Sequence, residues 1–223
     1  GYNSANFDWF WIFERCKALN LDIKKIATPM IPNKTISQRE SMLKLANEVE
    51  MFNQVKMWGY NVIDIIHSVR RAQAINSNIK EAGLKYITKF IEAESADRIY
   101  IDHTKIGSMY AEKEEYWLNT QNGNYKKVGL DPKIDEVCVR RGDIYTKTTG
   151  DDIVEQYLED DLDETLLVDD EFNQATFLLA SLVPTTYERA STMGTATLWK
   201  MVMLAWSYKH GLAIPQKKER RNF

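Results

Sequence analysis

The stretch Gly1-Tyr-Asn-Ser-Ala-Asn-Phe-Asp8-Trp-Phe10 places a carboxylate, Asp8, directly before a continuous apolar run. Asn3 and Asn6 are typical of a turn, and the apolar run predicts a well-buried helix that starts just after Asp8. The pattern indicates a metal-binding carboxylate at a strand-to-helix junction, although an Asp in this place most often only caps a helix. The chain opens on Gly1, inside this pattern and without an initiator Met, which predicts an internal piece of a larger protein.

Length and composition are typical of an ordinary soluble globular protein. The 223 residues are 44% hydrophobic and 27% charged, which is enough for one sizeable core. A formal net charge of −3 argues against a strongly basic nucleic-acid-binding domain of the usual kind. The longest apolar stretches, such as residues 175–183, fall far short of the roughly 20 residues that span a bilayer. We therefore expect no membrane association.

The cysteines and histidines do not form a metal-binding or disulfide pattern. Cys16 and Cys138 match no zinc or disulfide spacing, and His67, His103 and His210 are far apart in the sequence. A reduced compartment is the default for such thiols. We expect the cytoplasm of a bacterium or of a virus-infected cell, or the nucleus if the source is eukaryotic.

The first half of the chain predicts alternating helices and strands. Apolar residues at helical spacing predict a helix over residues 37–52, and a Val- and Ile-rich run predicts a strand over residues 55–66. Two further helices are predicted over residues 67–75 and 76–90. The prolines at positions 29 and 32 predict a loop over residues 28–33.

The second half predicts a β-rich insertion followed by helices. Residues 97–149 contain strand-like runs at 98–101, 116–118 and 136–139, and the hairpin signals Gln121-Asn-Gly-Asn124 and Arg141-Gly-Asp143. Helical patterns return at 151–164, 172–182 and 195–209, and residues 216–223 form a basic tail.

Tyr157 and Asp161 are candidate catalytic residues. They are four residues apart and therefore share one face of the predicted helix. A two-metal nuclease needs hard oxygen ligands around cations about 3.5–4 Å apart and a group that orients water. Asp161 and Asp8 are candidate ligands, and Tyr157 is the candidate for orienting water. Asp160 competes with Asp161 for the ligand role, and acidic helices of this kind are most often only solvated faces.

Several stretches, in the right order, resemble the exonuclease region of family B DNA polymerases. The opening stretch resembles the second exonuclease motif, an Asn followed by an aromatic-Asp pair, in the form seen in delta-like and viral enzymes. Tyr157-Leu-Glu-Asp-Asp161 is similar to the third motif, a Tyr with an Asp four residues later. Tyr60-Asn-Val-Ile-Asp64 looks like the strand that carries an Asp in these proteins, and residues 77–90 occupy the place of the following helix.

The C-terminal part extends the resemblance toward the polymerase palm. Leu182-Val-Pro-Thr-Thr-Tyr187, the predicted helix around residues 199–206, and His210-Gly-Leu-Ala-Ile-Pro215 resemble the stretch that joins the exonuclease domain to the palm. The resemblance implies an α/β chain with part of a ribonuclease H-like fold, a mixed sheet with flanking helices. It implies a partial exonuclease domain at residues 1–182, with the β-rich insertion at about 97–149, and a helical connection at residues 183–223.

The resemblance also implies the roles of individual residues in a DNA-directed DNA polymerase with a proofreading 3′-to-5′ exonuclease, used in DNA replication. It makes Asp8 and Asp161 ligands of Mg²⁺ or Mn²⁺, and Tyr157 the residue that positions the attacking water. It makes Asn3 and Phe7 the residues that shape the second motif and contact the single-stranded 3′ end of DNA.

Three departures from the family pattern limit this interpretation. The first exonuclease motif, an Asp-x-Glu on an upstream strand, is absent because the chain begins after it, and the polymerase motifs Asp-x-x-Ser-Leu-Tyr-Pro-Ser and Tyr-Gly-Asp-Thr-Asp are absent as well. The insertion also lengthens the gap between Asp8 and Asp161. With two of four acidic ligands missing, we predict that the isolated chain is inactive. The alternatives are a stand-alone exonuclease of the same nuclease superfamily and a non-catalytic α/β binding protein.

Overall fold

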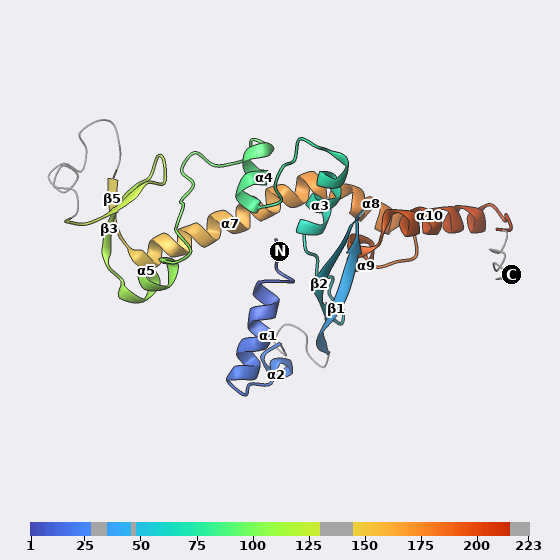
Figure 1. The fold of residues 1–223 in the computed structure, drawn as a ribbon, viewed down its shortest axis with the longest axis horizontal. Helices are drawn as coiled ribbons and strands as arrows, with labels where there is room; N and C mark the ends of the chain where they lie inside the picture. The colour runs from blue at the N-terminus through green and yellow to red at the C-terminus, as the bar shows by residue number, and fades with distance from the viewer. Residues whose placement is uncertain (28–34, 46–47, 130–144, 215–223) are drawn as a thin grey trace. The chain divides into compact units, whose positions relative to one another are not determined.

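The computed structural model describes residues 1–27, 35–45, 48–129 and 145–214, and the chain forms two compact units (Figure 1). The first unit comprises Gly1–Ala82 and Asp169–Phe223, and the second comprises Gly83–Val168. Helices combine with two small antiparallel sheets, so the α/β class is confirmed. The ribonuclease H-like fold stays a prediction. None of the helices in the described ranges is long and apolar enough to cross a membrane.

Helix α1 (Asp8–Ala18) begins at the predicted place, with Asp8 in its first turn, and α2 (Ile23–Ala27) follows it. The prediction that this helix is well buried is wrong, because Cys16 is its one buried residue, whereas Phe10 and Trp11 are exposed. The apolar residues surround the helix. The side that carries Trp9 and Phe13 packs against a hydrophobic cluster of the first unit, whereas Phe7, Phe10, Trp11 and Ile12 are exposed among the described residues.

Strands β1 (Ile36–Lys44) and β2 (Val49–Met57) pair antiparallel, in register from Ile36 opposite Met57 to Lys44 opposite Val49. The helix predicted over residues 37–52 is therefore wrong, and the strand predicted over 55–66 ends at residue 57. Apolar residues that recur every three or four positions fit a helix by local periodicity. The chain forms a hairpin instead of a helix because the backbone groups of the two strands form hydrogen bonds with each other. A local sequence pattern does not reveal this pairing.

Four more helices lie in the described part of the first unit, and three of them match predicted helices. The side chain of Arg71 donates hydrogen bonds to the carbonyl oxygens of Ala190 at 3.4 Å and Met193 at 2.6 Å, and so joins two distant stretches of the chain. Ala190 and Met193 belong to a buried cluster with Leu198. The helices are α3 (Ile66–Ile75), α8 (Gln174–Leu182), α9 (Tyr187–Thr192) and α10 (Thr195–Lys209).

In its described residues, the second unit contains a three-stranded antiparallel sheet of order β4-β3-β5 beside three helices. Its core includes Ile99, Ile101, Tyr116, Leu118 and Ile153. The segment 98–101 is not a strand, but it buries its two isoleucines, and the helix predicted over 76–90 shortens to α4. The elements are α4 (Leu84–Phe90), α5 (Ile106–Glu112), β3 (Glu115–Asn119), β4 (Tyr125–Lys127), β5 (Tyr145–Thr149) and α7 (Gly150–Phe172), whose last turn belongs to the first unit.

The predicted hairpin at residues 121–124 connects β3 and β4, and Gly123 is the residue that allows it. Gly123 has a φ of +66°, and a Cβ atom added there would lie 2.3 Å from the carbonyl oxygen of Arg98. The turn therefore packs directly on the backbone of the segment that carries Arg98. The predicted strand at 136–139, the Arg-Gly-Asp turn, the loop at 28–33 and the basic tail lie outside the described residues.

Candidate functional site

The opening stretch of the chain is held in place by Asp64, which lies directly before α3. The buried carboxylate of Asp64 accepts hydrogen bonds from the backbone N–H groups of Asn3 at 2.7 Å, Ala5 at 2.9 Å and Ile66 at 3.3 Å. The N–H of Ile65 also donates to the carbonyl oxygen of Gly1 at 2.9 Å. We call this arrangement, residues 1–8 together with Asp64, the Asp64 turn. It ties the residue in front of α3 to the stretch that leads into α1.

The backbone of the Asp64 turn has the conformation that its asparagines favour. Asn3 has a φ of +53°, a region that Asn tolerates better than most residues. Its carbonyl oxygen accepts from the N–H of Phe7 at 3.1 Å, while the side-chain oxygen of Asn6 accepts from the N–H of Asn53 on β2 at 3.1 Å. The predicted turn is therefore present, and it is anchored to the first sheet.

Asp8 and Phe7 lie at the exposed end of this turn. Asp8 is in the first turn of α1, where the positive end of the helix dipole favours a carboxylate. Although Asp8 is exposed as a residue, neighbouring atoms partly desolvate its carboxylate and raise its pKa, and the nearby Asp64 adds to this rise against an opposing backbone hydrogen bond. Phe7 is 64% exposed. An exposed aromatic ring and an exposed carboxylate thus lie side by side in sequence at a fixed turn.

Beneath the Asp64 turn lies a small cavity of about 20 Å³, bounded in part by Asp64 and His67. The buried ring of His67 lies 4.4 Å from the Phe52 ring, centroid to centroid, and neither of its nitrogens has a hydrogen-bond partner in the described part of the chain. Burial lowers the pKa of His67 to about 4, so the ring is neutral at pH 7. Burial raises the pKa of Asp64, and the three backbone N–H donors partly offset this rise.

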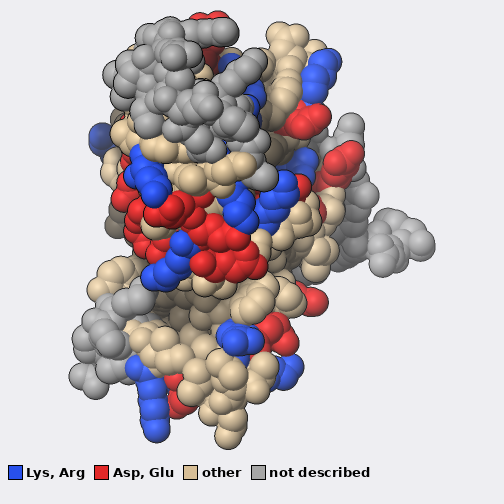
Figure 2. Space-filling model, turned by 90° about the vertical axis from the view of Figure 1, so that its left-hand side faces the viewer, with Lys and Arg blue, Asp and Glu red and all other residues tan. Residues whose placement is uncertain are grey.

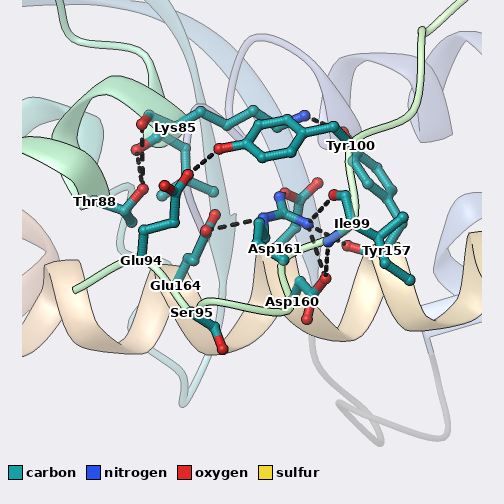
Figure 3. Close-up of polar contacts among 12 residues, drawn as sticks. Lys85, Thr88, Glu94, Ser95, Ile99, Tyr100, Tyr157, Asp160, Asp161 and Glu164 are labelled. Atoms are coloured by element: carbon teal, nitrogen blue, oxygen red, sulfur yellow. Dashed lines mark hydrogen bonds and ion pairs between the residues drawn. The ribbon is translucent and has the colours of Figure 1, made fainter. Parts of the chain in front are cut away.

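In the second unit, the guanidinium of Arg98 lies among three carboxylates from consecutive turns of α7. Figure 3 labels these carboxylates, Asp160, Asp161 and Glu164. Its Nη1 lies 3.2 Å from Oδ2 of Asp160, its Nε lies 2.9 Å from Oε1 of Glu164, and its Nη2 pairs with Oδ1 of Asp161. The Arg98 side chain is 2% exposed. We call these four residues the Arg98 cluster. Because none of the residues of α7 is Lys or Arg, the cation comes from another segment.

Tyr157 lies beside the Arg98 cluster, between two cationic side chains. The Arg98 guanidinium carbon is 5.0 Å from the centre of the Tyr157 ring, and Nζ of Lys85 is 4.6 Å from it. Lys85 also donates a hydrogen bond to the Tyr157 hydroxyl at 3.1 Å. Figure 3 shows Tyr157 and Asp161 on the same helix, as their spacing predicts. Both predicted third-motif residues therefore contact Arg98.

The charges within the Arg98 cluster do not balance. Burial would lower the pKa of Arg98, but Glu164 and Asp161 beside it raise the pKa above its ordinary value. Burial raises the pKa of Glu164, and Arg98 only partly lowers it again. The second carboxylate oxygen of Glu164, Oε2, is buried without a hydrogen-bond partner among the described residues. On the face drawn in Figure 2, Asp and Glu side chains gather with Lys and Arg side chains beside them.

The donor chemistry of the Arg98 cluster fits Mg²⁺ or Mn²⁺, because carboxylate oxygens are the ligands that these cations prefer. The orphaned Oε2 of Glu164 is an unused donor of the same kind. Within the described ranges, no group of three or more His, Cys, Asp or Glu residues is arranged to hold a metal ion. In this arrangement the guanidinium of Arg98 lies among Asp160, Asp161 and Glu164 instead.

The structure thus divides the predicted site residues between the two units. Asn3, Phe7 and Asp8 lie together in the first unit, and Tyr157 and Asp161 lie together in the second. Sequence reasoning missed two partners that organise these groups. Asp64 was named as the Asp of a predicted strand but not as a partner of the opening stretch, and Arg98 lay in a run assigned to a strand.

Protein-family models, curated proteins and solved structures were all compared with the chain, and none of them matches it.

Proposed function

We propose that this chain is part of the proofreading 3′-to-5′ exonuclease region of a family B DNA polymerase. The observation that carries the proposal is the Asp64 turn, in which Asn3 adopts a positive φ and Asp8 is exposed in the first turn of α1. This turn presents the carboxylate of Asp8 at the surface, where it can serve as the metal ligand that the resemblance implies. The resemblance of the third motif and of the C-terminal stretch, in the same order along the chain, supports the same proposal.

Each residue has a role in the proposed reaction, the hydrolysis of the terminal phosphodiester of a DNA strand. The exposed ring of Phe7 stacks on an unpaired base at the 3′ end, since every base offers a face to an aromatic ring. The Tyr157 hydroxyl orients the attacking water, and Asp8 and Asp161 are the metal ligands. Two bound divalent cations supply the activation of water and the stabilisation of the departing 3′ oxygen.

The proposed fold and domains follow from the same resemblance. We place residues 1–182 in a partial exonuclease domain of the ribonuclease H-like type, and residues 183–223 in a connection toward the polymerase palm. In this proposal Asp8 and Asp161 alone provide too few oxygens to hold two cations, so the polypeptide 1–223 does not hydrolyse DNA by itself. The proposed substrate is the single-stranded 3′ end of DNA.

The test uses the protein encoded by the longest open reading frame that contains this chain. We expect it to remove a mismatched 3′ nucleotide from a primer in Mg²⁺, and Asp8→Ala to reduce this rate by at least about 100-fold, the scale of losing an essential electrostatic group. Glu14→Ala, at an exposed carboxylate on the same helix, is the matched control and should retain the rate. Absence of nuclease activity in the wild-type protein, or equal rates for Asp8→Ala and wild type, would refute the proposal.

The polypeptide 1–223 is assayed in parallel on single-stranded DNA. Its expected inactivity follows from the small number of ligands. Degradation of DNA in Mg²⁺ that disappears on Asp8→Ala would show instead that this chain holds a complete site.

A further inference from the structure

Arg98 is the positive group that lies among three carboxylates of α7. Its side chain is almost fully buried, and it contacts Asp160, Asp161 and Glu164 at the same time. We infer that Arg98 is an internal counter-ion that competes with divalent cations for Asp161. The inference deepens the proposed function, and the role of Asp161 as a metal ligand rests on that proposal.

Arg98 is fixed from several sides, so it does not swing away from the cluster. The Nη1 atom of Arg98 donates hydrogen bonds to the carbonyl oxygen of Ile99 at 2.8 Å and to that of Tyr157 at 3.4 Å. Gly123 packs so closely against the Arg98 carbonyl that a single methyl group would not fit there. The buried Glu164 holds the Nε side of the guanidinium. When a divalent cation replaces Arg98 as the partner of a carboxylate, the carboxylate therefore moves and Arg98 stays in place.

Asp161 is the carboxylate best placed to leave. Asp160 is held twice, because its Oδ2 accepts from Arg98 and from the backbone N–H of Ile99 at 3.0 Å. Glu164 is 5% exposed, whereas the side chain of Asp161 is 29% exposed and its carboxylate pairs with Nη2 of Arg98. A change of rotamer frees Asp161 toward solvent, and Asp160 and Glu164 remain to neutralise Arg98.

The net charge of the Arg98 cluster also favours the binding of another cation. One guanidinium faces three carboxylates, which leaves an excess of negative charge when all three are ionised. The buried Oε2 of Glu164 has no hydrogen-bond partner in the described part of the chain, and this is a separate sign that a positive group is missing. Arg98 therefore stabilises the acidic turn of α7 without a metal and weakens divalent binding at Asp161, because the ion pair must be broken first.

The test measures the affinity of the 1–223 polypeptide for Mn²⁺ by electron paramagnetic resonance of the free ion. The key variant combines Arg98→Met with Glu164→Gln, because removing the buried cation and its buried partner together leaves no isolated charge. Since the competing charge-assisted hydrogen bond is gone, we expect Mn²⁺ to bind about tenfold more tightly than to the wild type. Circular dichroism shows whether the double variant keeps its helices.

Two additions to the double variant identify the ligand. Asp161→Asn should abolish the gain in Mn²⁺ affinity, whereas Asp163→Asn, at an exposed carboxylate on the same helix, should preserve it. An unchanged affinity in the double variant, or a gain that survives Asp161→Asn, would overturn the inference.

A measurement on the wild-type polypeptide keeps the inference testable if the double variant does not fold. Nuclear magnetic resonance follows the Arg98 Nε–H during a titration with Mg²⁺. Because the guanidinium loses one partner, we expect a saturable shift that Asp161→Asn removes, and a resonance that does not move would contradict the competition. Neither readout requires nuclease activity. If Arg98 competes with the cation but the protein of the longest open reading frame has no nuclease activity, the proposed function alone is refuted. If that protein is an active nuclease but Arg98 does not compete, this inference alone is refuted.

Discussion

The Asp64 turn and the Arg98 cluster stabilise buried carboxylates in different ways. Asp64 uses backbone N–H groups of Asn3, Ala5 and Ile66, which every sequence except proline supplies. Asp161 and Glu164 of α7 instead pair with one side chain, Arg98, which also binds Asp160. We therefore expect the first arrangement to tolerate changes of its donor residues and to be sensitive to Asp64 itself. We expect the second to lose stability when Arg98 alone is replaced, and the variants below test both expectations.

The largest expected effect is that of Arg98→Met on the second unit. This change leaves Glu164 buried without its cation, and breaking a buried pair on one side costs about 4 kcal/mol of the free energy of unfolding. Urea unfolding followed by circular dichroism measures the loss. Adding Glu164→Gln should recover at least half of it. A loss below about 1 kcal/mol in the single variant would show that solvent, rather than Arg98, stabilises these carboxylates.

The next effect is a pH dependence beneath the Asp64 turn. Because the pKa of His67 is about 4 in the folded protein and 6.5 in the unfolded chain, the unfolded chain binds more protons between these values. Stability from the neutral ring is therefore fully present above pH 6.5 and is lost as the pH falls toward 4. The full loss is about 3 kcal/mol, of which about 2 kcal/mol should appear between pH 7 and pH 5.

Chemical unfolding at a series of pH values checks this expectation in the range from pH 7 to pH 5. The raised pKa of Asp64 acts in the opposite direction, so the comparison with a His67 variant isolates the contribution of the histidine. His67→Gln, which keeps a polar side chain but does not titrate, should remove the slope. A slope that persists in this variant would assign the effect to another group.

A smaller effect is expected for Asp64→Asn in the Asp64 turn. The amide keeps one acceptor oxygen, but its NH₂ group faces at least one backbone N–H that the carboxylate now satisfies, which costs about 2 kcal/mol of the free energy of unfolding. Asp8→Asn removes an exposed carboxylate of the same turn and should change stability by less than about 0.5 kcal/mol. Equal losses in the two variants would show that charge, rather than hydrogen bonding, is what Asp64 contributes.

We expect the smallest change in stability from a substitution at Phe7, which lies at the exposed end of the Asp64 turn, away from the buried Asp64. Phe7→Ala should leave stability within about 0.5 kcal/mol, because the ring is exposed. It should weaken the binding of a single-stranded oligothymidine to the 1–223 polypeptide by about fivefold, the scale of one modest stacking contact. Fluorescence anisotropy measures the affinity. Trp58→Ala, at another exposed aromatic residue of the same unit, should have no effect on binding.

Much of the local structure was predictable. Helix α10 has the predicted bounds, and α8 ends at the predicted residue, because apolar periodicity and a following Gly or Pro are local signals. The Asn-Gly turn between β3 and β4 was predictable for the same reason. The hairpin of β1 and β2 was not, since an apolar spacing that also fits a helix is decided by pairing with another strand.

Local sequence specifies the turn that leads into α1 and the start of that helix at Asp8, because asparagines favour a turn and the apolar run predicts the helix. It also placed Tyr157 and Asp161 on one side of a helix, because their spacing is four residues. The partners that hold these groups come from distant segments of the chain. Asp64 meets Asn3 across 61 positions of sequence, and Arg98 meets Asp161 across 63. Contacts at such separations arise from packing, which no local pattern of charge or polarity specifies.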